Sequence, residues 1–279
     1  MSPDNNPTEE ELAWAAQLKQ AAAANDCNIQ IDTDEVSDWE YLQHAIVAKS
    51  NTRKALQRLQ HLQAFKSRYG ILGDGSVEEA ARDLRTFLQT HPGLYLSLAT
   101  AANGDQIFCS EYRHFQASRM KTEEAYAVYM RAAFYVLQAS QANLTALRSG
   151  LVLFMDIEGS LRYRSFTTEA RARELYGTAY PIRLKRVVLL QSSPTLRFLY
   201  RWMVQPWMSR KVKEILCFPS VTRDQYLLQR QQDDDPNHHK VPANCIPEVW
   251  GGQIPTDKFH ETILTRLTER YERAATFQL

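Results

Sequence analysis

Gly150-Leu-Val-Leu-Phe-Met-Asp-Ile-Glu-Gly159 is the stretch of sequence that decides the fold class. It contains five consecutive apolar residues, 151–155, and a second short apolar run follows at 187–190. Continuous runs of this length are typical of strands that are buried on both faces of a parallel sheet. The span 167–176 between them has helical character, as the crossover between two parallel strands requires. The sequence therefore predicts an α/β fold with a mainly parallel, twisted sheet.

Helical periodicity dominates the chain on either side of this region. Apolar residues recur at helical spacing, with Gly70 as a stop signal, in the spans 7–24, 39–47, 55–65, 78–89 and 256–275. Residues 106–112 predict a short strand, and 122–140 predict a long helix with Thr122 as its N-cap. We therefore expect a helical N-terminal region over 1–90, an α/β domain over 91–255 and a C-terminal helix over 256–279.

Composition narrows the class of protein. The chain has 279 residues, of which 44% are hydrophobic and 23% charged, so it can bury a large core and is neither disordered nor fibrous. No apolar run approaches the roughly 20 residues that span a bilayer, and residues 1–11 are polar and acidic rather than signal-like. We expect a cytoplasmic protein. Its four cysteines are far apart, without metal-ligand spacing, and are expected to be reduced thiols: Cys27, Cys109, Cys217 and Cys245.

Charge is distributed unevenly although the net charge is only +1. Residues 1–40 carry ten acidic side chains and one basic one, whereas residues 181–215 carry eight basic side chains and one acidic one. A basic patch of this kind can face nucleic acid, a phosphoinositide headgroup or the acidic N-terminal region itself. The bases cluster without a recognised nucleic-acid motif, so we expect no nucleic-acid partner.

The segment 196–208 is apolar around most of a helix. Its polar face consists of Arg197, Arg201 and Gln205, and its apolar residues include Leu196, Phe198, Leu199, Trp202, Met203 and Trp207. Such a helix can pack on a core or face lipid. Trp202 and Trp207 would lie roughly 140° apart on an α-helix, so one is expected to face inward and the other solvent.

Motifs for catalysis and metal binding are missing from the sequence. It contains no GxxxxGK[ST], GxSxG or HExxH, and His238 and His239 lie in an acidic stretch that suits a surface loop better than a metal site. Asp156 and Glu158 end a predicted strand, where an α/β enzyme could place carboxylates, but no nucleophile or base accompanies them. We therefore expect a protein that is not an enzyme and needs no cofactor or metal.

Four landmarks occur in order over about a hundred residues. They are Gly150 to Gly159, Tyr180-Pro-Ile-Arg-Leu-Lys185 before an apolar run, Pro206-Trp-Met-Ser-Arg-Lys-Val-Lys213, and Ile246-Pro-Glu-Val-Trp-Gly-Gly252. Together they resemble the CRAL-TRIO lipid-binding domain family, especially the branch that includes the α-tocopherol transfer protein and cellular retinaldehyde-binding protein. Weaker similarity extends back to about residue 45.

This resemblance implies a sheet that floors an apolar lipid pocket and a mobile gate that covers it. The pocket and gate positions are Phe154, Leu189, Leu196, Phe198, Leu199, Trp202, Met203 and Trp207. The basic positions that bind a phosphoinositide headgroup in the family match Arg183, Lys185 and Lys211. The implied function is binding of one hydrophobic lipid and its transfer between membranes, with an anionic membrane surface as a transient partner.

Three features depart from the family pattern, and two alternative functions are considered beside the resemblance. Ile215 stands where the family has the last arginine of its headgroup cluster, residues 43–49 lack the arginines of the N-terminal signature, and residues 229–240 look inserted. The first alternative is a protein-interaction module on the same fold that carries no lipid. The second is an enzyme that uses Asp156 and Glu158.

Overall fold

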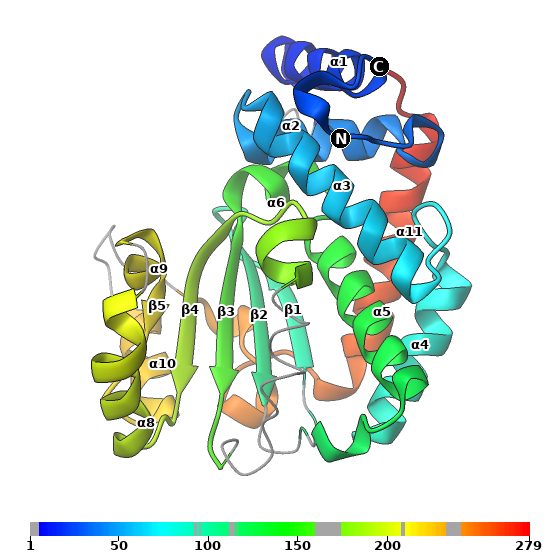
Figure 1. The fold of residues 1–279 in the computed structure, drawn as a ribbon. Helices are drawn as coiled ribbons and strands as arrows, with labels where there is room; N and C mark the ends of the chain where they lie inside the picture. Colours follow the sequence, from blue (N-terminus) through cyan, green and yellow to red (C-terminus); the bar gives the residue numbers. More distant parts are fainter. Residues whose placement is uncertain are drawn as a thin grey trace.

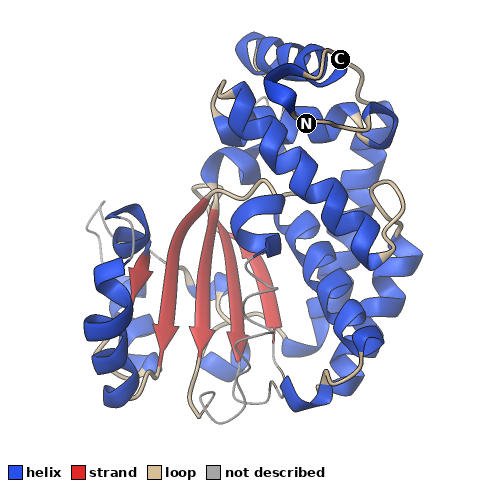
Figure 2. Cartoon of the chain, viewed as in Figure 1, coloured by secondary structure: helices blue, strands red, loops and turns tan. Residues whose placement is uncertain are grey.

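The computed structural model describes residues 6–91, 94, 96–111, 115, 117–159, 174–207, 210–232 and 241–279. A five-stranded sheet lies at the centre, with strand order β1-β2-β3-β4-β5 (Figure 2). The strands are β1 (Leu96–Thr100), β2 (Gln106–Glu111), β3 (Leu151–Asp156), β4 (Leu184–Leu190) and β5 (Leu216–Cys217). β1 is antiparallel to β2 and all other neighbours are parallel. The predicted α/β class and mainly parallel sheet are therefore confirmed.

The helices predicted from periodicity are present with small shifts at their ends. They are α1 (Glu9–Ala23), α2 (Asp38–Ala48), α3 (Thr52–Tyr69), α4 (Val77–Thr90), α5 (Glu123–Ser140) and α11 (Phe259–Thr276). The hydroxyl of Thr122 caps α5 as expected, and α3 ends at Gly70, whose φ is 66°. The predicted crossover helix 167–176 lies mostly outside the described residues, which resume with a π-helical turn at Glu174–Ala179.

Shorter helices complete the chain around the sheet. They are α6 (Leu144–Ser149), α8 (Pro194–Leu199), α9 (Arg210–Ile215) and α10 (Arg223–Gln232). Figure 1 shows α8, α9 and α10 along the β5 edge of the sheet, whereas α4, α5 and α11 lie beyond the β1 edge and α1 to α3 lie above the sheet. Within the part of the chain described, no helix is both long enough and apolar enough to cross a membrane.

Two faces of the sheet contribute to different apolar clusters. The front face is defined by the side chains of Phe108, Ser110, Leu153, Met155, Val187 and Leu189, and part of it packs with α3, α4, α5 and α11. The back face carries Ile107, Cys109, Val152, Phe154 and Val188, which pack against α10 and residues 241–250. Residues 241–250, in orange, lie behind the sheet in Figure 1.

A third apolar cluster lies in the N-terminal helices and crosses the predicted boundaries. It joins α1, α2 and α3 to Leu144 and Leu147 of α6, and Phe277 packs against it from the C-terminal segment. The ring of Phe277 lies 5.8 Å from that of Trp39. The N-terminal helices and the C-terminal helix are thus packed onto the α/β part of the chain.

Two landmark glycines are explained by close backbone approach. A Cβ on Gly150, whose φ is 103°, would lie 2.5 Å from the carbonyl oxygen of Arg183, so this glycine permits the entry to β3 beside β4. A Cβ on Gly252 would lie 2.0 Å from the carbonyl oxygen of Ile246. The turn at 246–252 therefore requires glycine at its last position.

Candidate functional site

The front face of the sheet carries apolar side chains that helices cover only in part. Because strand residues alternate between faces, the register aligns Phe108, Leu153 and Val187 in one row, and the next row is Ser110, Met155 and Leu189. All of these except Ser110 are partly exposed. A row of half-buried apolar side chains on a central sheet is a surface that an apolar ligand can cover.

A small apolar cavity adjoins this surface on the β1 side. It has a volume of about 40 Å³ and is lined mainly by aromatic and aliphatic side chains of α4, α5, β1 and β2, including Phe87, Leu96, Phe108, Tyr129 and Val136. Phe108 belongs to both the cavity wall and the front face. The apolar surface therefore continues from the middle of the sheet towards α5.

The two predicted floor residues lie on opposite faces. Leu189 is on the front face, whereas Phe154 is fully buried on the back face with its ring 6.4 Å from that of Tyr226. A ligand on the front face would contact Leu189 but not Phe154, whose side chain lies on the other side of the sheet. Sequence reasoning missed Leu153, Met155 and Val187, which the alternation within the apolar runs could have identified.

The predicted gate is not one continuous α-helix. α8 passes into a π-helical segment at Tyr200–Val204 and then a 3₁₀ turn at Gln205–Trp207, so the expected 140° separation of Trp202 and Trp207 does not apply. Phe198 and Trp202 are 61% and 67% exposed, with ring centroids 6.1 Å apart, while Leu196 is half-buried. The side chains of Leu199, Met203 and Trp207 lie outside the described part of the structure.

The predicted headgroup residues have intramolecular partners where their side chains are described. Arg183 donates a hydrogen bond to the carbonyl oxygen of Arg148 at 2.7 Å, and Lys185 forms an ion pair with the buried carboxylate of Asp105. β4 has a one-residue bulge at Lys185, because Leu151 pairs with Leu184 and Val152 pairs with Arg186. The Lys211 side chain lies outside the described residues.

Asp156, the residue of the enzyme hypothesis, lies in a buried ionic cluster. Arg223 of α10 donates to Asp156 at 3.0 Å and to Glu111 at 3.2 Å, and the indole of Trp250 donates to Glu111 at 3.1 Å. Gln191 donates to Asp156 at 2.7 Å. These contacts tie the ends of β2 and β3 to α10 and to the landmark turn that contains Trp250. The carboxylate of Asp156 thus has a structural role.

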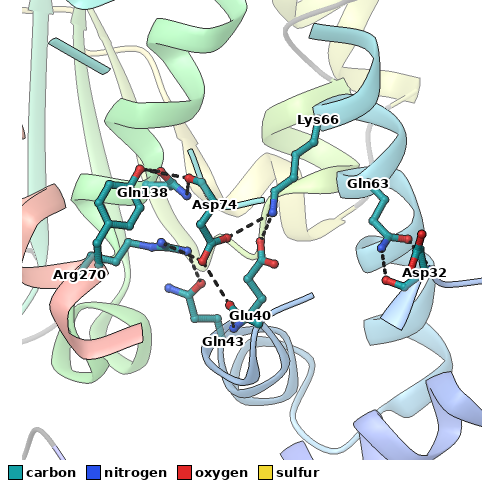
Figure 3. Close-up of polar contacts among 10 residues, drawn as sticks. Asp32, Glu40, Gln43, Gln63, Lys66, Asp74, Gln138 and Arg270 are labelled. Atoms are coloured by element: carbon teal, nitrogen blue, oxygen red, sulfur yellow. Dashed lines mark hydrogen bonds and ion pairs between the residues drawn. The ribbon is translucent and has the colours of Figure 1, made fainter. Parts of the chain in front are cut away.

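A second buried ionic network joins the N-terminal helices to the C-terminal helix (Figure 3). Lys66 of α3 contacts Glu40 of α2 at 2.6 Å and Asp74 at 3.2 Å, and Arg270 of α11 contacts Asp74 at 3.3 Å. The side chains of Gln138 and Tyr271 both donate hydrogen bonds to the backbone carbonyl oxygen of Asp74. Sequence reasoning counted Glu40 only as part of an acidic N-terminal region and assigned no role to Asp74 or Arg270.

Burial and mutual repulsion set the ionisation of this network. Burial, together with the charge of Asp74, raises the pKa of Glu40 to about 7. Burial alone would also raise the pKa of Asp74, but Arg270 and Lys66 hold it well below its usual range. One turn along α2, burial and then the charges of Arg58 and Lys66 lower the pKa of His44 well below its usual value.

Among the described residues, no group of three or more His, Cys, Asp or Glu side chains could hold a metal ion. Comparison with curated proteins gave no match. The profile of the CRAL/TRIO domain matches residues 100–252, which is more than half of the chain. The matched region includes strands β2 to β5, α8 and the π-helical segment after it, which together carry the exposed aromatic pair, and the turn with Gly252. The chain therefore belongs to the CRAL/TRIO domain family.

Proposed function

We propose that this protein takes up one hydrophobic lipid on the front face and carries it between membranes. Family membership implies a hydrophobic ligand, and CRAL/TRIO domains are typically non-catalytic. The observation that supports transfer is the pair Phe198 and Trp202, which are exposed on the segment that follows β4. Large exposed apolar side chains beside Arg201 suit a surface that enters a membrane interface. The four landmarks favour the branch of the α-tocopherol transfer protein, and we place the activity in the cytoplasm.

The proposed division of labour follows the observed packing. Residues 91–255 would bind the ligand. Residues 1–90 would stabilise this domain through the second ionic network, to which the helix in 256–279 contributes Arg270. Ligand affinity would come from apolar area removed from water, at roughly 25 cal/mol per Å². Transfer would come from the affinity of the exposed aromatic pair for lipid.

We expect Trp202→Ala to slow transfer of a pyrene-labelled lipid between vesicles about tenfold while leaving its equilibrium affinity within about twofold. Burying an aromatic side chain in an apolar phase contributes roughly 1.5 to 3 kcal/mol. The variant would lose this free energy when it inserts into the membrane, because the exposed Trp202 side chain contacts the membrane rather than the ligand. Wild-type protein should bind the lipid in about a one-to-one ratio. Transfer is measured by the change in pyrene excimer fluorescence as lipid reaches acceptor vesicles.

Leu72→Ala provides the matched control, because Leu72 is exposed on the loop between α3 and α4. It should change neither rate nor affinity. Trp207→Ala is expected to weaken affinity more than rate. Wild-type protein that takes up no lipid would favour the protein-interaction alternative, and a Trp202→Ala protein that merely melts at lower temperature would show that this segment is a fixed part of the core.

We also propose that Arg183, Lys185 and Lys211 attract anionic membranes. Reversing all three charges to Glu should lower association with phosphatidylserine vesicles by more than tenfold at low salt, because each base near such a surface contributes about 1 kcal/mol. Wild-type binding should weaken as salt rises, since exposed charges are screened. Vesicle co-sedimentation at several salt concentrations measures both effects.

The control for this charge reversal changes three exposed bases on other elements, Arg53, Lys121 and Lys258, to Glu. It produces the same change in net charge. Equal loss of binding in both triple variants would show that net charge alone acts. Asp105→Asn removes the partner of Lys185 and should strengthen binding if Lys185 contacts the membrane.

A further inference from the structure

A buried hydroxyl on the front face has no hydrogen-bond partner. The side chain of Ser110 is 1% exposed, and its Oγ forms no hydrogen bond within the described part of the structure. A hydroxyl removed from water without a partner costs free energy, so buried polar groups are nearly always bonded. The Ser97 Oγ, on the other face of the sheet, also forms no hydrogen bond among the described residues, so what distinguishes Ser110 is its position on the front face.

Strand register places this hydroxyl at the proposed ligand surface. Ser110 is two residues after Phe108 on β2, so both side chains are on the front face. Its neighbours across the sheet are Leu96 on β1 and Met155 on β3. Leu96 and Phe108 line the 40 Å³ cavity, and Met155 is partly exposed. Ser110 thus lies between the cavity and the apolar row that ends at Leu189.

The surroundings of Ser110 suit an uncharged group. Its described neighbours on the front face are Leu96, Phe108, Met155 and, one strand further, Leu189, which all have apolar side chains. A charged headgroup here would find no opposite charge among these four residues and would be costly to bury. A single hydroxyl or carbonyl oxygen needs only one hydrogen bond.

We propose that the bound lipid carries one uncharged oxygen function, a hydroxyl or carbonyl, that hydrogen-bonds to Ser110 Oγ. Its hydrocarbon then lies over Leu153, Met155, Val187 and Leu189. This inference rests on the proposed function, because it concerns the ligand of the same site. It selects neutral lipids with one polar group and disfavours ligands that bring a charged headgroup to this part of the sheet.

The test uses two fluorescent probes, pyrene-dodecanol and dodecylpyrene, which share the ring and the chain and differ by one hydroxyl. Wild-type protein should bind the alcohol about threefold to tenfold more tightly, the ratio that one net hydrogen bond gives. Ser110→Ala should lose the preference for the alcohol, because the hydroxyl of the probe would then be buried without a hydrogen-bond partner, while its affinity for the hydrocarbon should change little. Ser110→Cys, which is close in shape and a weak donor, should also lose the preference, and it provides a second variant if the alanine protein folds poorly.

Ser97→Ala is the matched control. The Ser97 hydroxyl is also buried and forms no hydrogen bond within the described residues, but Ser97 pairs with Cys109 on the back face, so the preference for the alcohol should remain. Equal binding of both probes by wild-type protein, or a preference that survives in Ser110→Ala, would overturn the role of Ser110 and leave lipid binding intact. Failure of wild-type protein to bind either probe would overturn the proposed function and this inference with it.

Discussion

Replacing Asp74 by alanine is expected to lower the free energy of unfolding by about 3 to 5 kcal/mol, because it leaves buried positive charge without its partner. Arg270 is fully buried, and Asp74 is the carboxylate that it contacts, at 3.3 Å. Lys66 would retain Glu40 at 2.6 Å. The loss should therefore come mainly from Arg270, which would keep a 3.5 Å hydrogen bond to Gln43 but no carboxylate in this network.

Urea unfolding of the purified variants measures this effect. Glu214→Ala is the control, because it also removes a carboxylate paired with an arginine, but Glu214 is 61% exposed and its loss should cost less than about 1 kcal/mol. Asp74→Asn keeps the shape and one acceptor oxygen, so its stability should fall between those of the wild type and Asp74→Ala. Similar losses for Asp74→Ala and Glu214→Ala would show that the network is hydrated rather than buried.

The stability of the wild-type protein is expected to change little between pH 6.5 and 4.5 through Glu40 and His44, because these two residues act in opposite directions. The pKa of Glu40 is raised from 4.5 to about 7, so folding takes up a proton and stability is lost as pH rises through this range. The pKa of His44 is lowered from 6.5, so folding releases a proton and stability is lost as pH falls below 6.5. Each contributes up to about 1.4 kcal/mol per pH unit.

Single variants should separate the two contributions. His44→Leu should become more stable relative to wild type as pH falls from 6.5 to 5, and Glu40→Gln should become less stable over the same range. Leucine is suitable because His44 is buried and neither ring nitrogen has a hydrogen-bond partner within the described residues. Urea unfolding at several pH values measures the slopes. Parallel pH profiles for the three proteins would show that neither residue changes its ionisation on folding.

The sequence predicted the central strands and long helices because each has a strong periodic signal. β3 begins with the apolar run 151–155 and β4 ends with the apolar run 187–190, while α5 has both a cap and a repeating apolar face. β1 was missed because Leu96–Thr100 contains Ser, Ala and Thr and has only a weak alternating pattern. Its antiparallel pairing with β2 is a tertiary property that follows from the turn at 101–105.

The candidate site could be predicted only at the level of segments. Strand assignment identified the runs that contain Leu189 and Phe154, but their separation onto two faces depends on which helices cover each side. The irregular helix at 200–207 departs from the α-helical period that sequence reasoning assumes. The ionic network of Glu40, Lys66, Asp74 and Arg270 could not be predicted, because each charged residue alone is typical of an exposed helix or loop.

The contact between Asp74 and Arg270 also has a consequence for the order of folding during synthesis. The two residues are 196 positions apart, so at 5 to 20 residues per second the ribosome adds Arg270 roughly 10 to 40 s after Asp74. During this interval Lys66 is the cation of the network that Glu40 and Asp74 both contact. Burying two carboxylates beside one cation costs free energy, so this part of the nascent chain is unstable before Arg270 is added. The ionic network that holds the N-terminal helices can therefore be completed only after α11 has been synthesised.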